Sequence, residues 1–217
     1  MLEQGPLLKV CGVTNPADAI MCAERGVQML GLNFACESQR YVEREAAAEI
    51  IRAVRAASRA VRFVGVFVNE QLELVSSLAQ ELTLDAIQLH GNESPEYARA
   101  LRPMFLIKAF RVGPQYDESL AANYPSNAIL LDSWNAKFRG GTGETFDWSV
   151  ARSLRPRVSQ LILAGGLTAH NVRAAIPVVR PYAIDVCSGV EDSPGRKSRE
   201  KLCALLEALR ETPAISP

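Results

Sequence analysis

The sequence lacks an excess of charge of either sign, a long apolar run and a paired cysteine motif. Its 24 Lys and Arg residues balance its 24 Asp and Glu residues, so the formal net charge is zero. Zero net charge argues against a nucleic-acid surface and against an anionic membrane partner. No apolar run reaches the roughly 20 residues that span a bilayer, and Met1–Pro6 lacks the basic segment and apolar core of a signal peptide. We therefore expect a cytoplasmic protein.

The cysteines are few and unpaired. Five is an odd number, and no two of them form a CxxC motif. Disulfide frameworks and zinc sites usually show cysteines in regular, closely spaced pairs. We expect free thiols, with Cys22 and Cys203 packing within helices. The sequence also shows no convincing ligand cluster for a metal or for a nicotinamide, and we expect no cofactor.

The chain instead shows a regular alternation of short apolar runs and helical patterns, eight times over 217 residues. Continuous apolar runs of this length are typical of buried parallel strands. Repeating units of about 25 residues predict an α/β fold, a (β/α)8 TIM barrel with residues 1–217 as a single domain. The predicted strands are Leu8–Cys11, Met29–Phe34, Arg62–Val68, Asp85–Leu89, Phe105–Phe110, Ala128–Asp132, Gln160–Leu163 and Tyr182–Val186.

An open, doubly wound sheet is the alternative, but its glycine-rich loop usually follows the first strand. Helix start signals fit either fold. Asn15 and Ser94 each precede a proline and can cap a helix, and Thr168 is expected to cap Ala169–Ala175. The other predicted helices are Glu45–Ala57, Gln71–Leu82, Glu118–Asn123 and Arg199–Arg210.

Glycine-rich loops follow the last three predicted strands. In a TIM barrel the active site lies at the C-terminal ends of the strands, and phosphate is often held after strands seven and eight. Glycine amides and a serine hydroxyl can donate to phosphate without a charged side chain. Turn formation alone could explain any one loop, but three in adjacent units favour an anion site. The predicted phosphate-binding residues are Gly141, Gly143, Gly165, Gly166, Ser188 and Gly189.

Polar residues also interrupt the predicted strands, where burial requires a partner or a function. Asp132 ends the sixth strand beside a glycine-rich loop, which suggests a small phosphorylated substrate. Lys9 and Cys11 share one face of the first strand. Asp185, on the last strand, is the expected partner of Lys9. Cysteine is often simply a small buried apolar residue, so Cys11 alone does not establish a catalytic site.

Further polar residues lie at or near the ends of strands two, four and five. Gln88 and His90 share a face of the fourth strand, although His90 could bond only within its loop. Arg40 follows the second strand and could meet a carboxylate through two hydrogen bonds. For Lys108, in the fifth strand, we expect the side chain to extend to the lower rim of the barrel. We predict that Arg40, Gln88, His90 and Asp185 contact a small-molecule substrate.

Eight short motifs, read together, resemble the phosphoribosylanthranilate isomerases of tryptophan biosynthesis. The likeness runs from about residue 8 to residue 201, and each motif is weak alone. The motifs are Lys9-Val10-Cys11-Gly12-Val13-Thr14, Ser38-Gln39-Arg40-Tyr41-Val42, Val64-Gly65-Val66-Phe67-Val68, Gln88-Leu89-His90-Gly91, Leu131-Asp132-Ser133, Gly140-Gly141-Thr142-Gly143, Leu163-Ala164-Gly165-Gly166-Leu167 and Asp185-Val186-Cys187-Ser188-Gly189-Val190-Glu191.

The resemblance implies an Amadori rearrangement of a phosphoribosyl substrate by general acid–base catalysis. It implies that Cys11 is the general base, that Asp132 is the general acid and that Arg40 binds the anthranilate carboxylate. The chain departs from the family pattern at Gln39, Cys187 and Ser198. These departures concern the loops around the site rather than the acid, the base or the phosphate donors.

Two other functions compete with this one. The related isomerase of histidine biosynthesis also performs an Amadori rearrangement, but it pairs two aspartates, whereas strand one here ends in Cys11. A catalytically silent phosphosugar-binding barrel is the non-enzymatic alternative. Binding alone requires neither Cys11 nor Asp132, so we favour the isomerase. No oligomeric state is predicted.

Overall fold

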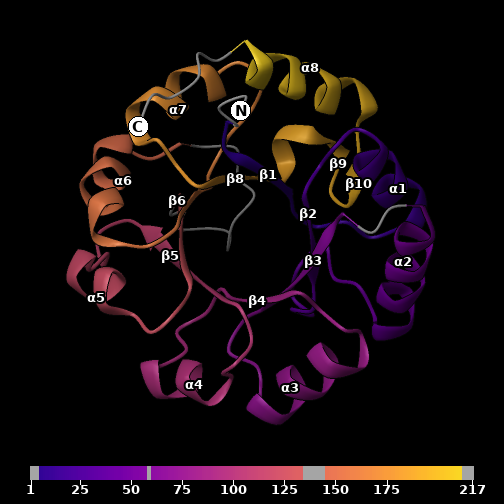
Figure 1. Cartoon of the computed structure of the whole chain (residues 1–217), viewed down its shortest axis with the longest axis horizontal. Helices are drawn as coiled ribbons and strands as arrows, with labels where there is room; N and C mark the ends of the chain where they lie inside the picture. The colour runs from indigo at the N-terminus through magenta and orange to yellow at the C-terminus, as the bar shows by residue number, and fades with distance from the viewer. Residues whose placement is uncertain (1–4, 58–59, 134–144, 212–217) are drawn as a thin grey trace.

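The computed structural model describes residues 5–57, 60–133 and 145–211. Within them eight parallel strands close into a barrel, since each strand pairs with the next and β1 pairs with β8. Figure 1 looks down this barrel and shows the helices as a ring around it. The predicted TIM barrel is confirmed, and every strand lies within two residues of its predicted bounds. The strands are β1 (Leu7–Val10), β2 (Met29–Asn33), β3 (Arg62–Phe67), β4 (Ala86–Leu89), β5 (Leu106–Val112), β6 (Ala128–Ser133), β7 (Leu161–Leu163) and β8 (Ala183–Val186).

The helices begin where capping residues satisfy their first amides. The Asn15 side chain accepts from the Asp18 amide at 2.9 Å, and Ser94 accepts from the Tyr97 amide at 3.2 Å, as predicted. The helices are α1 (Pro16–Glu24), α2 (Arg44–Ala57), α3 (Leu72–Glu81), α4 (Pro95–Ala100), α5 (Glu118–Asn123), α6 (Trp148–Leu154), α7 (Val172–Val179) and α8 (Arg199–Arg210), with the short 3-10 helices η1 (Arg155–Arg157) and η2 (Ser188–Val190).

One helix start was predicted wrongly. Helix α7 begins at Val172 rather than at residue 169. The intervening residues form a turn, in which Asn171 accepts from the Thr168 amide at 2.9 Å and donates to the Gly166 carbonyl at 2.8 Å. Because Asn171 holds this turn closed, the glycine loop after β7 gains three residues before the helix starts.

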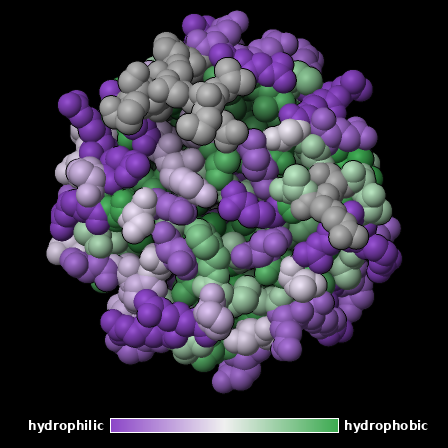
Figure 2. Space-filling model, in the orientation of Figure 1, coloured by the Kyte–Doolittle hydropathy of each residue, from purple (hydrophilic) through white to green (hydrophobic). Residues whose placement is uncertain are grey.

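Apolar side chains pack on both faces of the barrel wall. Alternate residues of each strand point inward, and the inward set includes Met29, Val64, Ile107, Leu130 and Ile162. The outward set packs against the apolar faces of the helices. Figure 2 shows hydrophilic residues dominating the outer rim of the face in view, with hydrophobic surface between them nearer the centre.

Lys108 does not reach the lower rim of the barrel. Its neighbours Ile107 and Ala109 point inward, so Lys108 points outward, where its side chain is 3% exposed. Its ammonium donates to the Gly91 carbonyl and to Glu93, both at 2.7 Å. The expectation was wrong because the Glu93 carboxylate, in the loop after β4, forms a buried charge-assisted hydrogen bond with the Lys108 ammonium. Water at the lower rim would provide a weaker interaction. Lys108 thus supports that loop from outside the barrel.

A small hairpin after β8 was also not predicted. Strands β9 (Glu191–Ser193) and β10 (Arg196–Lys197) pair in antiparallel fashion ahead of α8. All five cysteines lie in the described ranges, and all are free thiols. Across those same ranges, no helix combines the length and the apolar character needed to cross a membrane.

Candidate active site

A pocket lies where the C-terminal ends of the strands meet. Its lining includes ten of the twelve residues predicted to form the site. These are Cys11, Arg40, Gln88, His90, Asp132, Gly165, Gly166, Asp185, Ser188 and Gly189. The other two, Gly141 and Gly143, lie outside the described residues.

The thiol of Cys11 stands at the top of β1. The Cys11 amide donates to the Val186 carbonyl at 2.9 Å, which continues the β1–β8 ladder and fixes the residue at the seam of the barrel. Burial raises the pKa of the Cys11 thiol, and the cation of Lys9 acts against this shift. Before substrate binds, the thiol is therefore mostly protonated at neutral pH.

Two residues before Cys11, on β1, Lys9 is wholly buried and pairs with Asp185. The ammonium lies 2.8 Å from Oδ2 of the carboxylate, across the β1–β8 register. Burial alone would lower the pKa of Lys9, but the attraction of Asp185 outweighs it and the pKa is raised. The ion pair predicted from the sequence is present, and it leaves Oδ1 of Asp185 buried and without a partner among the described residues. This free oxygen belongs to a residue that lines the pocket.

The carboxyl group of Asp132 lies near the end of β6, and the residue is 7% exposed. Its Oδ1 accepts from the Ser133 amide at 2.8 Å. Its Oδ2 lies 3.4 Å from Nε2 of His90, without the alignment of a hydrogen bond. The other ring nitrogen of His90 meets the Gln88 amide nitrogen at 2.9 Å, so a chain of three polar side chains crosses from β4 to β6.

The loops after β7 and β8 form one wall of the pocket. Gly165, Gly166, Ser188 and Gly189 all line it. The two loops touch through their backbones, because a Cβ on Gly189 would overlap the carbonyl oxygen of Leu167. A wall of bare backbone and one hydroxyl suits an anionic group that is bound by amides.

Arg40 comes from the loop after β2 and also lines the pocket. Its amide donates to the Ser38 hydroxyl at 3.1 Å, which shapes the loop. Its guanidinium pairs with Glu191 at 2.7 Å, and Glu191 also pairs with Lys197 at 2.7 Å. Glu191 and Lys197 were not predicted as site residues. The available signal was that these two charged residues follow shortly after the predicted phosphate-binding residues Ser188 and Gly189.

The order of strands around the barrel gives the site its arrangement. Asp132 is on β6, the glycine loops follow β7 and β8, Cys11 follows β1, and Arg40 follows β2. The carboxyl and the thiol thus flank the two glycine loops, and the guanidinium lies beyond the thiol. Among the described residues, no group of three or more His, Cys, Asp or Glu side chains is placed to hold a metal.

Comparison with known proteins assigns the chain to a family. A family model described as N-(5'phosphoribosyl)anthranilate (PRA) isomerase matches residues 8–208. The chain belongs to this family. The N-(5'-phosphoribosyl)anthranilate isomerase of Trichlorobacter lovleyi is 42% identical over 204 residues, which cover 94% of this chain and 98% of that one. The isomerase of Geobacter sp. (strain M21) is 47% identical over 198 residues, which cover 90% and 93%.

Solved structures of PRA isomerases show the same fold. The enzyme from Thermotoga maritima superposes with a TM-score of 0.87 at 39% identity, over 94% of this chain and 98% of that one. A PRA isomerase in complex with reduced 1-(o-carboxyphenylamino)-1-deoxyribulose 5-phosphate superposes with a TM-score of 0.84 at 38% identity, with the same coverage. The family resemblance predicted from the eight motifs is confirmed.

Proposed function

We propose that the chain catalyses the Amadori rearrangement of N-(5′-phosphoribosyl)anthranilate to 1-(2-carboxyphenylamino)-1-deoxyribulose 5-phosphate, a step of tryptophan biosynthesis. One observation carries the proposal beyond family membership. A carboxyl on β6 and a thiol after β1 flank two adjacent backbone-lined loops. This arrangement suits a phosphosugar that must be protonated at one atom and deprotonated at another.

In the first half of the reaction Asp132 acts as the general acid. Its protonated carboxyl donates a proton to the ribose ring oxygen while the bond from that oxygen to C1′ breaks. The electrons of the breaking bond stay with the oxygen, the nitrogen lone pair forms a C1′=N double bond, and the product is a protonated Schiff base with a free hydroxyl. His90, 3.4 Å from the carboxyl, and Gln88 contact the ribose hydroxyls on this side.

In the second half Cys11 acts as the general base. The cationic nitrogen of the Schiff base acidifies the C2′ proton, and the thiolate removes it. The electrons of the C–H bond form a C1′=C2′ double bond, which neutralises the nitrogen. The resulting enol then tautomerises to the ketone. Burial raises the pKa of Cys11 and thus disfavours the thiolate in the free protein. The positive charge on the bound intermediate stabilises the thiolate at the step that requires it.

The phosphate end and the anthranilate end of the substrate bind at separate parts of the pocket, with the reacting sugar carbons between them. The phosphate accepts hydrogen bonds from the Gly165 and Gly166 loop and from the Ser188 and Gly189 loop. The anthranilate carboxylate meets Arg40. Asp185 directs its unpaired buried oxygen at a hydrogen-bond donor of the substrate, near the reacting carbon.

A turnover assay tests the proposed function directly. Freshly prepared phosphoribosylanthranilate is mixed with the protein, and the loss of its fluorescence is followed with the phosphoribosyl substrate of histidine biosynthesis run in parallel. We expect conversion of the anthranilate compound and little conversion of the other. Absence of turnover, or a preference for the histidine-pathway compound, would reject the proposal.

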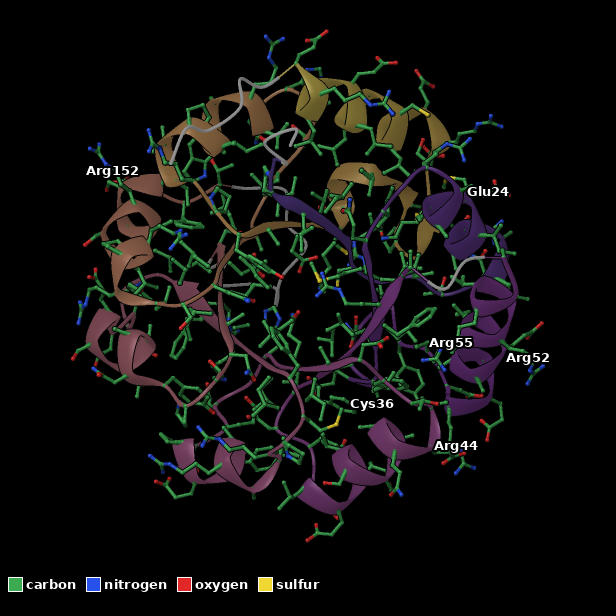
Figure 3. All side chains as sticks on the ribbon, in the orientation of Figure 1. Glu24, Cys36, Arg44, Arg52, Arg55 and Arg152 are labelled. Carbon is green, nitrogen blue, oxygen red and sulfur yellow. The ribbon has the colours of Figure 1, made fainter. Side chains whose placement is uncertain are left out.

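Removal of Arg40 tests how the substrate carboxylate is held. We expect Arg40→Ala to raise KM roughly 10- to 100-fold with a smaller change in kcat, because the lost contact is made in both ground and transition states. Steady-state kinetics measure both constants. Arg44→Ala is the control, since Arg44 lies on α2 at the outer rim in Figure 3 and is exposed. An unchanged KM in Arg40→Ala would show that Arg40 does not bind the carboxylate.

A further inference from the structure

A buried carboxylate, Glu191, stands behind Arg40. Oε2 of Glu191 accepts from Nη2 of Arg40 at 2.7 Å, and Nε of Arg40 lies 3.0 and 3.1 Å from the two oxygens. Oε1 also accepts from the Lys197 ammonium at 2.7 Å and from the Gly195 amide at 3.2 Å. Both oxygens of this carboxylate are thus engaged by cationic and amide donors of the protein. Glu191 is therefore suited to hold Arg40 in place rather than to exchange a proton with a substrate.

The pairing leaves one edge of the guanidinium free. Within the described part of the chain, the side-chain hydrogen bonds of Arg40 use Nε and Nη2, and none uses Nη1. Arg40 lines the pocket, and its side chain is 13% exposed. A guanidinium is planar, so a carboxylate that grips one edge also fixes the direction of the other.

Lys197 connects this cluster to the catalytic strand. Its side chain is wholly buried, and its ammonium donates to the Cys11 carbonyl at 2.5 Å as well as to Glu191. The Arg40 side chain lies against the next residue, Gly12, where an added Cβ would come within 2.5 Å of the Arg40 Cδ. The arginine, the carboxylate and the lysine are thus packed against the end of β1.

We propose that Glu191 and Lys197 are positioning residues for the substrate carboxylate. Glu191 aims Arg40, and Lys197 offsets the charge of Glu191, so that the cluster presents one net positive charge to one carboxylate. This inference rests on the proposed function. It extends that function by assigning the preference for a carboxylated aromatic ring to Glu191 and Lys197, which do not contact the substrate themselves.

The charge balance explains why a lysine is required. Arg40 and Glu191 alone would form a neutral pair, which attracts an anion weakly. With Lys197, two cations face one anion inside the protein, where screening by salt is weak. Burial opposes the charged form of both Glu191 and Arg40, but their mutual contacts prevail: the pKa of Glu191 is lowered and that of Arg40 is raised. The arginine and the carboxylate are accordingly both charged near neutral pH.

The experiment compares two ligands that differ only in the carboxyl group. One is reduced 1-(o-carboxyphenylamino)-1-deoxyribulose 5-phosphate, and the other is its phenylamino counterpart without the carboxyl. Calorimetry gives Kd for each, and their ratio measures discrimination by the carboxyl site. We expect the wild-type protein to prefer the carboxylated ligand by roughly 10- to 100-fold, as for a charge-assisted hydrogen-bond pair.

Lys197→Met removes the offsetting charge. We expect it to lower the ratio about tenfold, while Kd for the ligand without the carboxyl stays near the wild-type value. Lys197→Gln should do the same while keeping a donor for the Cys11 carbonyl, and it carries the test if the methionine variant does not fold. The double variant Glu191→Gln/Lys197→Met leaves Arg40 as the cation of the cluster but offers it one acceptor oxygen in place of two. We therefore expect a ratio above that of Lys197→Met and below that of the wild type, and full recovery would show that Glu191 does not aim Arg40.

Asp192→Asn is the matched control. Asp192 follows Glu191 in β9, but it is exposed and pairs with Lys201 at 3.5 Å. The ratio of the two Kd values in this variant should therefore stay at the wild-type value. Wild-type ratios in both Lys197 variants, or no recovery in a double variant that still binds the uncarboxylated ligand, would overturn the inference. These results are separable from failure of the proposed function, which would appear as a wild-type protein without turnover of phosphoribosylanthranilate.

Discussion

Replacing Asp132 with asparagine should lower kcat by at least about 10²-fold and leave KM nearly unchanged. Asparagine has the shape of the acid but no acidic proton to transfer, so opening of the ribose ring loses its proton donor. The interaction is made with the developing charge on the ring oxygen, and it therefore affects the transition state more than the bound substrate. Steady-state kinetics on the purified variant measure the effect.

The fold should survive this change. The amide oxygen of the asparagine would still accept from the Ser133 amide, the bond that Oδ1 of Asp132 makes at 2.8 Å. Asp192→Asn is the control, because it makes the same change from carboxyl to amide at an exposed position. A folded Asp132→Asn variant that turns over at a near-wild-type rate would remove Asp132 from the role of general acid.

Cys11→Ser is expected to lower kcat by at least about 10²-fold as well. A serine hydroxyl loses its proton far less readily than a thiol, so the C2′ proton has no competent acceptor. The change is nearly isosteric, and the backbone amide at this position would still donate to the Val186 carbonyl. Both KM and Kd for the reduced product should remain close to the wild-type values, since the thiol acts on one proton.

The control for this variant is Cys36→Ser. Cys36, labelled in Figure 3, is the exposed cysteine of the five and should be replaceable without loss of rate. If Cys11→Ser kept most of its activity with the fold intact, another group would have to remove the C2′ proton.

Periodicity alone predicted the barrel well. Buried parallel strands are continuous apolar runs, so all eight strands could be located from the sequence. The β9–β10 hairpin could not, because Glu191–Ser193 and Arg196–Lys197 carry no apolar pattern. Helix α7 was placed early because both Thr168 and Asn171 can cap a helix, and only the tertiary fold selects between a cap and a turn.

Residues that line the pocket could be predicted where they lie on the strands or directly after them. Polar residues at strand ends, such as Asp132, stand out against apolar neighbours, and a barrel brings such ends together. The pairing of Arg40 with Glu191 joins residues 151 positions apart. No local sequence pattern can predict a contact over that separation, so the partner of Arg40 could be identified only from the three-dimensional structure. Lys108 was misplaced for the same reason, since its carboxylate lies in another loop.

The seam of the barrel has a consequence for how the protein matures. Lys9 and Asp185 are 176 residues apart, and Cys11, the proposed general base, directly follows the strand that closes the sheet. A nascent chain that has folded through β7 would already contain the thiol and the lysine, but neither the aspartate that pairs with the lysine nor the loop that follows β8. The pocket is therefore completed late in synthesis, once β8 has docked onto β1 and the segment that carries Glu191 and Lys197 has followed it.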